Sequence, residues 1–180
     1  MSTKPRIYIA DLGAYNAGNL HGCWVDANQE PDEMLTDWET ECGPVPDEYA
    51  IHDYEGFGKI KISEYADLAT VSRLASLSAA YDEAFTVWYA EEEHPVNDEL
   101  ENLFLEEYVG TYDSEKDFAM SLADDNGAIV TAIGSVELHG RDAEIINAYL
   151  DWDAIARDLL IDGFYAVKSS DYRIFVFRRI

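Results

Sequence analysis

The sequence has few basic residues. Its 180 residues include 12 Lys and Arg against 37 Asp and Glu, which gives a formal net charge of −25. Because nucleic-acid phosphates are held mainly by Lys and Arg, we expect no direct binding of nucleic acid. Self-repulsion of this size opposes compaction, and folding does not require it. The charge therefore needs a functional explanation.

Long apolar runs are absent too. No run of about 18 uncharged apolar residues exists, so we expect no membrane span. Residues 1–9 lack the apolar run of a secretory signal. Cys23 and Cys42 are 19 residues apart with no CxxC pattern. This spacing favours free thiols in a reducing cytoplasm.

Motifs for catalysis and metal binding are missing as well. The sequence contains no HExxH, P-loop, GxGxxG or GxSxG pattern. The four histidines stand singly: His21, His52, His94 and His139. Residues 151–162 begin like an EF-hand loop but lack its Gly at position six and Glu at position twelve. We therefore expect no catalytic residue, metal or cofactor.

What the sequence does have is acidic residues in two long stretches. Residues 7–58 and residues 74–115 each contain twelve acids and no Lys or Arg. The acids alternate with apolar residues at structural periods, so the carboxylates should be fixed on folded elements rather than on a flexible tail. A net of 25 charges matches the phosphates of roughly 42 Å of duplex, at about one charge per ~1.7 Å.

The sequence pattern predicts an α+β fold. The first third alternates as strands over residues 6–12, 23–27 and 49–54, with a helix over residues 31–41 that stops at Gly43. Apolar residues spaced by three or four then predict a long helix capped by Ser63. The middle of the chain is the more helical part.

The remaining helices and strands are predicted from caps and turns. Asn97 is expected to cap a helix that begins with Asp98 and Glu99 and ends at Gly110. Residues 114–117 resemble a capping box, and residues 126–127 form a turn. Asp151 is expected to cap a helix over 152–162 that Gly163 stops. Residues 164–168 and 172–178 then form a hairpin.

Aromatic residues beside acids have two interpretations. Examples lie in residues 53–55, 88–91 and 107–108. The first interpretation is ordinary core packing. The second is that exposed Tyr and Trp add contact area to an acidic interface.

Five segments together resemble one known family. They are Ile7-Tyr-Ile-Ala-Asp-Leu12, Tyr15-Asn-Ala-Gly-Asn-Leu-His-Gly22, Ala50-Ile-His-Asp-Tyr-Glu-Gly-Phe57, LFLEEYVGTYDSEKDFA at 103–119, and Asp162-Gly-Phe-Tyr165. In this order they resemble the ArdA antirestriction proteins, which bacterial conjugative plasmids, transposons and phages carry. The segment at 103–119 is similar to the family's antirestriction motif. Its residues here are Leu103, Glu107, Tyr108, Gly110, Tyr112, Ser114, Asp117, Phe118 and Ala119.

The resemblance implies a function and a layout. ArdA proteins are not enzymes, and they inhibit type I restriction-modification enzymes by occupying the DNA-binding surface of the methyltransferase core. They act as elongated dimers of three small domains that imitate a curved duplex. Here these would be an α/β domain at 1–61, a helical domain at 62–108 and an α+β, dimerising domain at 109–180. The expected location is the bacterial cytoplasm.

The acids expected to imitate phosphates come from the two stretches without basic residues. They are Asp32, Asp37, Glu91, Glu92, Glu93, Asp98, Glu99, Glu106, Glu107 and Asp113. Two alternatives stay open. One is an acidic enzyme or metal-binding protein, because carboxylate pairs such as 124–125 occur by chance in an acidic chain. The other is a halophilic protein, in which the acidic composition is an adaptation to high salt concentration rather than to a binding partner.

Overall fold

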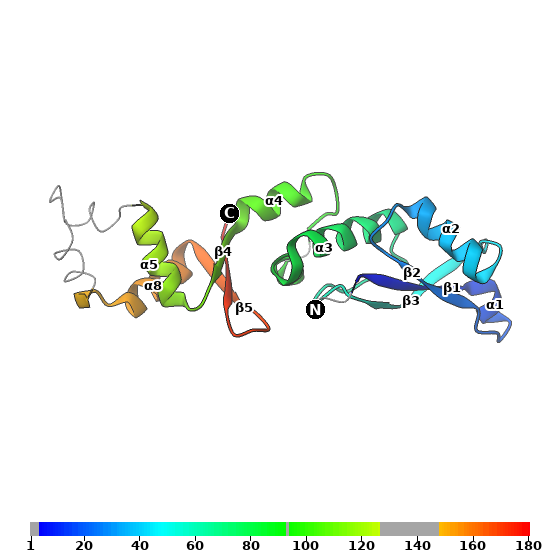
Figure 1. The fold of residues 1–180 in the computed structure, drawn as a ribbon, viewed down its shortest axis with the longest axis horizontal. Helices are drawn as coiled ribbons and strands as arrows, with labels where there is room; N and C mark the ends of the chain where they lie inside the picture. The colour runs from blue at the N-terminus through cyan, green and yellow to red at the C-terminus, as the bar shows by residue number, and fades with distance from the viewer. Residues whose placement is uncertain (1–3, 93, 127–147) are drawn as a thin grey trace. The chain divides into compact units, whose positions relative to one another are not determined.

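The computed structural model describes residues 4–92, 94–126 and 148–180 (Figure 1). The chain divides into two compact units, residues 1–104 and residues 105–180. The described residues contain six helices and six strands, and both sheets are antiparallel. These elements confirm the α+β class. The division into three domains stays a prediction.

The N-terminal unit is built on a three-stranded sheet in the order β2-β1-β3. Strand β1 (Arg6–Asp11) pairs with β2 (Gly22–Asp26) on one side and with β3 (Tyr49–Glu55) on the other. The three predicted strands are confirmed. Because side chains alternate along a strand, Ile7 and Ile9 lie together on one face, fully buried.

Helix α2 (Pro31–Cys42) follows β2, as predicted, and the short helix α1 (Leu12–Asn16) follows β1. Pro31 begins α2, and just before it the Glu30 amide donates to the Glu33 carboxylate at 3.2 Å. Met34 and Trp38, four residues apart, are fully buried. The helix ends at Gly43, whose φ of 98° suits glycine.

The long helix α3 (Leu68–Glu91) begins four residues later than the predicted cap would place it. Asp67 is its N-cap, and the prediction of Ser63 was wrong. The Asp67 carboxylate accepts hydrogen bonds from the Thr70 amide at 2.8 Å and the Thr70 hydroxyl at 2.7 Å. The Ser63 hydroxyl instead accepts a bond from the Tyr65 amide in the preceding turn. The predicted apolar face is buried: Leu68, Val71, Leu74 and Leu77.

Helix α4 (Leu100–Glu107) differs from its prediction at both ends. Asn97 accepts a bond from the Glu99 amide at 3.0 Å, but this turn precedes the helix, so Asp98 and Glu99 lie before its first turn. Gly110 does not end it, because strand β4 (Tyr108–Tyr112) begins directly after Glu107. The β-forming residues of Tyr108–Tyr112 outweigh the glycine, which lies where the β4–β6 register shifts.

The C-terminal unit has a second sheet in the order β4-β6-β5. Strands β5 (Phe164–Lys168) and β6 (Ile174–Arg178) form the predicted hairpin, and β4 pairs with β6. The described helices of this unit are α5 (Glu115–Asn126) and α8 (Trp152–Asp162). Its core gathers Phe118, Ile174 and Val176 with partly buried neighbours from both helices.

The caps of this unit agree with the sequence. Asp151 accepts a bond from the Ala154 amide at 3.0 Å, and Gly163 ends α8. Ser114 accepts a bond from the Asp117 amide at 3.1 Å and donates its hydroxyl to the Asp117 carboxylate. The predicted turn at 126–127 extends beyond the described residues. Within the described ranges, no helix is long and apolar enough to cross a membrane.

Candidate acidic binding surface

Helix α2 presents acids on both flanks of its buried face. Since residues three or four apart share a side of a helix, Glu33, Asp37 and Glu41 form one ridge, and Asp32 and Glu39 lie on the opposite flank. All five are exposed. In the described part of the chain none of them forms an ion pair. Asp37 accepts one bond, from the neutral amide of Gln29 at 2.8 Å.

The charge spacing along α2 is close to that of a DNA strand. With Glu30, six acids occur between residues 30 and 41. At ~1.5 Å per residue they span about 17 Å, or about one charge per 3 Å. One strand of a duplex has a phosphate about every 3.4 Å along the axis. The helix therefore offers carboxylates at nearly the linear density of phosphates.

Acids also occupy helix ends where they are unfavourable. None of the described helices has a basic residue in its last turn. The last turns instead contain acids: Glu39 and Glu41 in α2, Glu91 in α3, Glu106 and Glu107 in α4, and Asp162 in α8. A carboxylate at the negative end of the helix dipole costs about 0.3–1 kcal/mol. Helix stability therefore does not explain these positions.

The other expected phosphate mimics are mostly exposed. Glu91 and Glu92 end α3, and Asp98 and Glu99 lie in the turn before α4. Glu93 lies outside the described residues. In the C-terminal unit Glu106 and Asp113 are exposed, whereas Glu107 is partly buried and has contacts of its own. The structure places these acids at helix ends and turns in each unit.

Some carboxylates are used within the fold instead. Glu101 accepts bonds from the Tyr81 hydroxyl and the Arg73 guanidinium, and these contacts lower its pKa. Asp67 and Asp11 each accept a backbone amide at a helix start, and these bonds help to lower their pKa values. Sequence inspection does not separate these acids from the outward ones, because all stand beside apolar residues.

The antirestriction motif mainly builds the frame of the C-terminal unit. Phe118 and Ala119 are buried in the core, and the Tyr112 ring contacts Phe118 with centroids 5.3 Å apart. The Tyr108 ring packs on Phe177 of β6 at 5.6 Å. Leu103 is partly buried in α4. These motif residues therefore contribute to packing within the fold, which positions the acids around them, rather than to an exposed surface.

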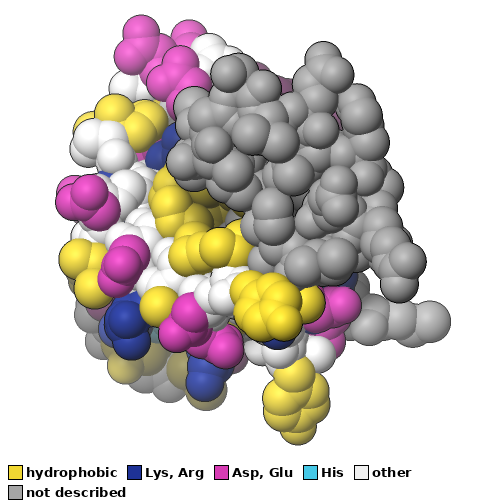
Figure 2. Space-filling model, turned by 90° about the vertical axis from the view of Figure 1, so that its left-hand side faces the viewer, with side chains coloured by type: hydrophobic (Ala, Val, Ile, Leu, Met, Phe, Trp, Pro, Cys, Tyr) yellow, Lys and Arg dark blue, Asp and Glu magenta, His cyan; other side chains and the backbone are white. Residues whose placement is uncertain are grey.

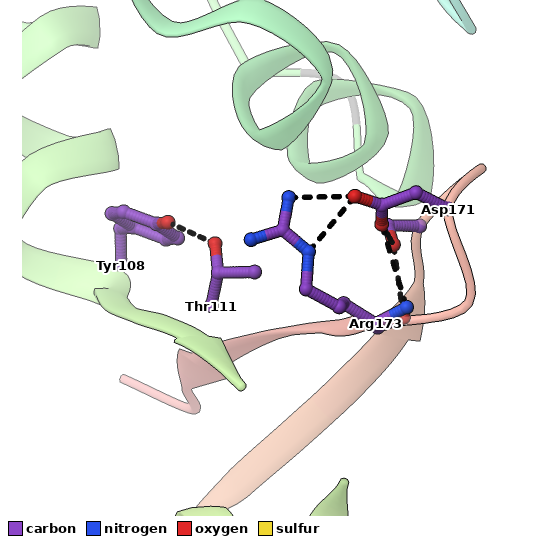
Figure 3. A network of polar contacts seen from close by, with 5 residues as sticks. Tyr108, Thr111, Asp171 and Arg173 are labelled. Carbon is purple, nitrogen blue, oxygen red and sulfur yellow. Dashed lines mark hydrogen bonds and ion pairs between the residues drawn. The ribbon is translucent and has the colours of Figure 1, made fainter. Parts of the chain in front are cut away.

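A polar network lies beside this motif (Figure 3). Tyr108 and Thr111 share a hydrogen bond of 2.8 Å. Arg173 pairs with Asp171 through Nε at 2.9 Å and Nη2 at 2.7 Å. These bonds, with one from Ser169, hold the pKa of the Asp171 carboxyl well below its usual range. The hairpin tip between β5 and β6 is thus charge-balanced.

The C-terminal unit mixes its charges on the side where α5 and α8 lie. Figure 2 shows acidic, basic and hydrophobic side chains interspersed on the coloured part of that face. This mixture contrasts with α2, which has acids and no Lys or Arg. The aromatic residues beside acids fall into two groups. Trp88 and Tyr89 are core residues, whereas Tyr54 and Tyr108 are partly buried.

The sequence pattern did not predict the contact between Tyr8 and Trp24. Tyr8 and Trp24 contact each other on the face of the sheet opposite Ile7 and Ile9. The signal available was strand alternation, which assigns residues 8 and 24 to one face once the register is known. Elsewhere in the described ranges, no three His, Cys, Asp or Glu side chains are grouped so as to hold a metal ion.

The fold and surface define an acidic α+β protein with two antiparallel sheets and many outward carboxylates. The family model described as antirestriction protein (ArdA) matches residues 7–173. The chain therefore belongs to the ArdA family, and its role is antirestriction. The family is defined by that role and not by a catalytic activity. No curated protein matches the chain.

Proposed function

We propose that this chain imitates B-form DNA and inhibits type I restriction-modification enzymes. It occupies the DNA-binding groove of the methyltransferase core in competition with DNA. It acts as a homodimer in the bacterial cytoplasm. Mobile genetic elements that enter the cell encode it. It binds mainly through surface charge and performs no chemistry.

The observation that carries this proposal is the acidic last turn of helices α2, α3, α4 and α8. Charge that opposes helix stability needs another reason to be present. A cationic groove supplies one, because binding would relieve the repulsion among these carboxylates. The phosphate-like spacing along α2 supports the same conclusion.

The mechanism follows from how enzymes hold DNA. Contacts to phosphates are largely independent of sequence, so a groove lined with Lys and Arg accepts any ordered row of anions. Long-range attraction between the acidic protein and the groove would accelerate encounter. Since the charge is distributed, no single acid should be indispensable.

A competition assay tests the proposal. Labelled target DNA, a type I methyltransferase core and this protein are mixed at two salt concentrations. The protein should displace the DNA at low salt and do so less well at high salt. If DNA stays bound at low salt, the mimicry proposal is wrong.

The same preparation separates the two alternatives. A halophilic protein would unfold at low salt, whereas a DNA mimic should be folded there. Metal analysis of the purified protein, with a nuclease and hydrolase screen, tests the enzyme or metal-binding alternative. Any stoichiometric metal or turnover would favour that alternative.

A further inference from the structure

Among the described residues of the N-terminal unit, no long helix covers one of the two faces of its sheet. Helix α2 packs on β2, and Figure 1 shows α2 and α3 on the same side of the sheet. The register places two cross-strand rows on the opposite, outer face. One row is Trp24–Tyr8–Asp53, and the other is Asp26–Arg6–Glu55. Each row combines acids with either rings or a guanidinium.

The two rings of this outer face form a fixed platform. The Tyr8 and Trp24 centroids are 5.7 Å apart in an edge-to-face contact, and both side chains are partly exposed. Gly22 makes room for the phenol, because a Cβ there would lie 2.8 Å from the Tyr8 ring and 2.4 Å from the Ile9 carbonyl oxygen. The platform is thus built into the strand pairing.

The platform already accepts a guanidinium within the chain. Arg6 lies over the Trp24 ring at 5.8 Å and donates to the Trp24 carbonyl at 3.2 Å. Its other contact, to Glu55, is a long 4.0 Å ion pair. Asp26 and Asp53 beside it have no ion pair among the described residues. In these two rows of described residues, the carboxylates of Asp26, Asp53 and Glu55 therefore outnumber the single guanidinium.

We propose that this outer face binds arginine side chains of the partner's DNA-binding groove, with the guanidinium packed against the Trp24 and Tyr8 rings and paired with Asp53. The inference rests on the proposed function and names the chemistry of the contact. An arginine that reaches into DNA meets a phosphate and a base. Here a carboxylate replaces the phosphate and an aromatic ring replaces the base. Lysine fits less well, because its ammonium does not stack in this way.

The indole of Trp24 can serve as a specific probe of this contact. The other three tryptophans, Trp38, Trp88 and Trp152, are at most 6% exposed. We would titrate the protein with hexa-arginine and hexa-lysine peptides and follow the Trp24 indole N–H resonance. The arginine peptide should shift that resonance and bind at least about threefold more tightly. Equal affinity for the two peptides would overturn the inference, since that result indicates charge attraction alone.

Two charge-matched variants test the same site without removing a ring. Arg6→Gln removes the internal guanidinium, and Lys4→Gln makes the same charge change at a nearby exposed position. Arg6→Gln should strengthen hexa-arginine binding about threefold more than Lys4→Gln does. If both variants bind the peptide alike, the platform does not hold guanidinium groups.

The competition assay then connects the face to the partner. Trp24→Leu should weaken displacement of DNA about tenfold without changing its salt dependence, because no charge is lost. Tyr65→Leu, at a ring that is 72% exposed, is the matched control and should behave like wild type. Circular dichroism and the Tm establish that each variant is folded.

The outcomes of the two proposals are distinguishable. If wild-type protein fails to displace DNA, the proposed function is wrong, whereas the peptide titration still decides the arginine site. If wild type displaces DNA and folded Trp24→Leu equals it, the outer face is not part of the interface. If Trp24→Leu is unfolded, the comparison of Arg6→Gln with Lys4→Gln decides.

Discussion

Arg73 of α3 and Glu101 of α4 form an ion pair in which Nη2 lies 3.1 Å from Oε2. The Tyr81 hydroxyl donates to the other carboxylate oxygen at 2.8 Å. Glu101 therefore joins two helices of the N-terminal unit. In this protein of net charge −25, it is an acid whose charge is balanced within the fold.

Glu101→Gln should lower the free energy of unfolding by about 1 kcal/mol, because it weakens two charge-assisted hydrogen bonds at a partly exposed site. Urea denaturation at pH 7 measures this effect. Asp98→Asn is the matched control, since Asp98 is exposed and makes no ion pair in the described ranges. Equal effects of the two variants would mean that charge removal alone sets stability.

The same pair predicts a pH dependence. Tyr81 and then Arg73 lower the pKa of Glu101 in the folded state. The stabilising contribution is therefore complete above the unfolded-state pKa and is lost as the pH falls through the folded-state pKa. The difference in unfolding free energy between wild type and Glu101→Gln should shrink toward acid pH. A difference that is constant from pH 7 to pH 3 would contradict this linkage.

Two acids of α2 should affect stability in opposite directions. Glu41→Gln removes a carboxylate from the last turn and should stabilise by about 0.3–1 kcal/mol, whereas Asp32→Asn removes one from the first turn and should destabilise by a similar amount. Both remove one outward charge, so both should weaken DNA displacement slightly. Urea denaturation with the competition assay measures both effects. If the more stable variant displaced DNA better than wild type and the less stable variant displaced it worse, a charge-based mechanism would be contradicted.

Asp82 breaks α3 at φ 50° and ψ −138°, a conformation in which only glycine is unstrained. Asp82→Gly should therefore raise stability by about 1 kcal/mol despite the flexibility of glycine. Asp82→Ala removes the same charge without relieving the backbone. The difference in Tm between the two variants measures the strain. If alanine stabilises as much as glycine, the gain comes from charge.

Cys23 should react slowly with alkylating reagents. Burial and a hydrogen bond with Cys42, together with nearby acids, raise the pKa of the Cys23 thiol to about 12. Because the thiolate is the nucleophile, native protein at pH 8 should be modified at Cys42 before Cys23. Mass spectrometry after iodoacetamide treatment measures the order, with denatured protein as the control. Modification of Cys23 first would contradict the raised pKa.

Sequence inspection predicted the elements whose signals are local. Strands β1, β2, β3, β5 and β6, helices α2 and α8, and the caps at Ser114 and Asp151 are all set by alternation or by a capping side chain. The α3 start was missed because Ser63 and Asp67 are both good caps, and only the hydrogen bonds of Thr70 decide between them. Strand β4 was missed because Gly110 resembles a helix stop.

The candidate surface was only partly predictable. Acids can be found in the sequence, but Glu101 and Asp98 look alike until α3 and α4 pack together. Likewise, Tyr8, Trp24 and Asp53 are distant in sequence, and the strand register with its shift beside Tyr8 aligns them. Long-range pairing of this kind has no local signal.

The two sheets differ in when their central strand is synthesised. In the N-terminal unit the central strand is β1, which precedes its partners, so each later strand can add to it as it leaves the ribosome. In the C-terminal unit the central strand is β6, which follows both of its partners. Among the described strands, β4 pairs with β6 alone, and more than 60 residues separate it from Ile174–Arg178. Nascent chains should therefore depend on that final strand to escape aggregation through an open edge.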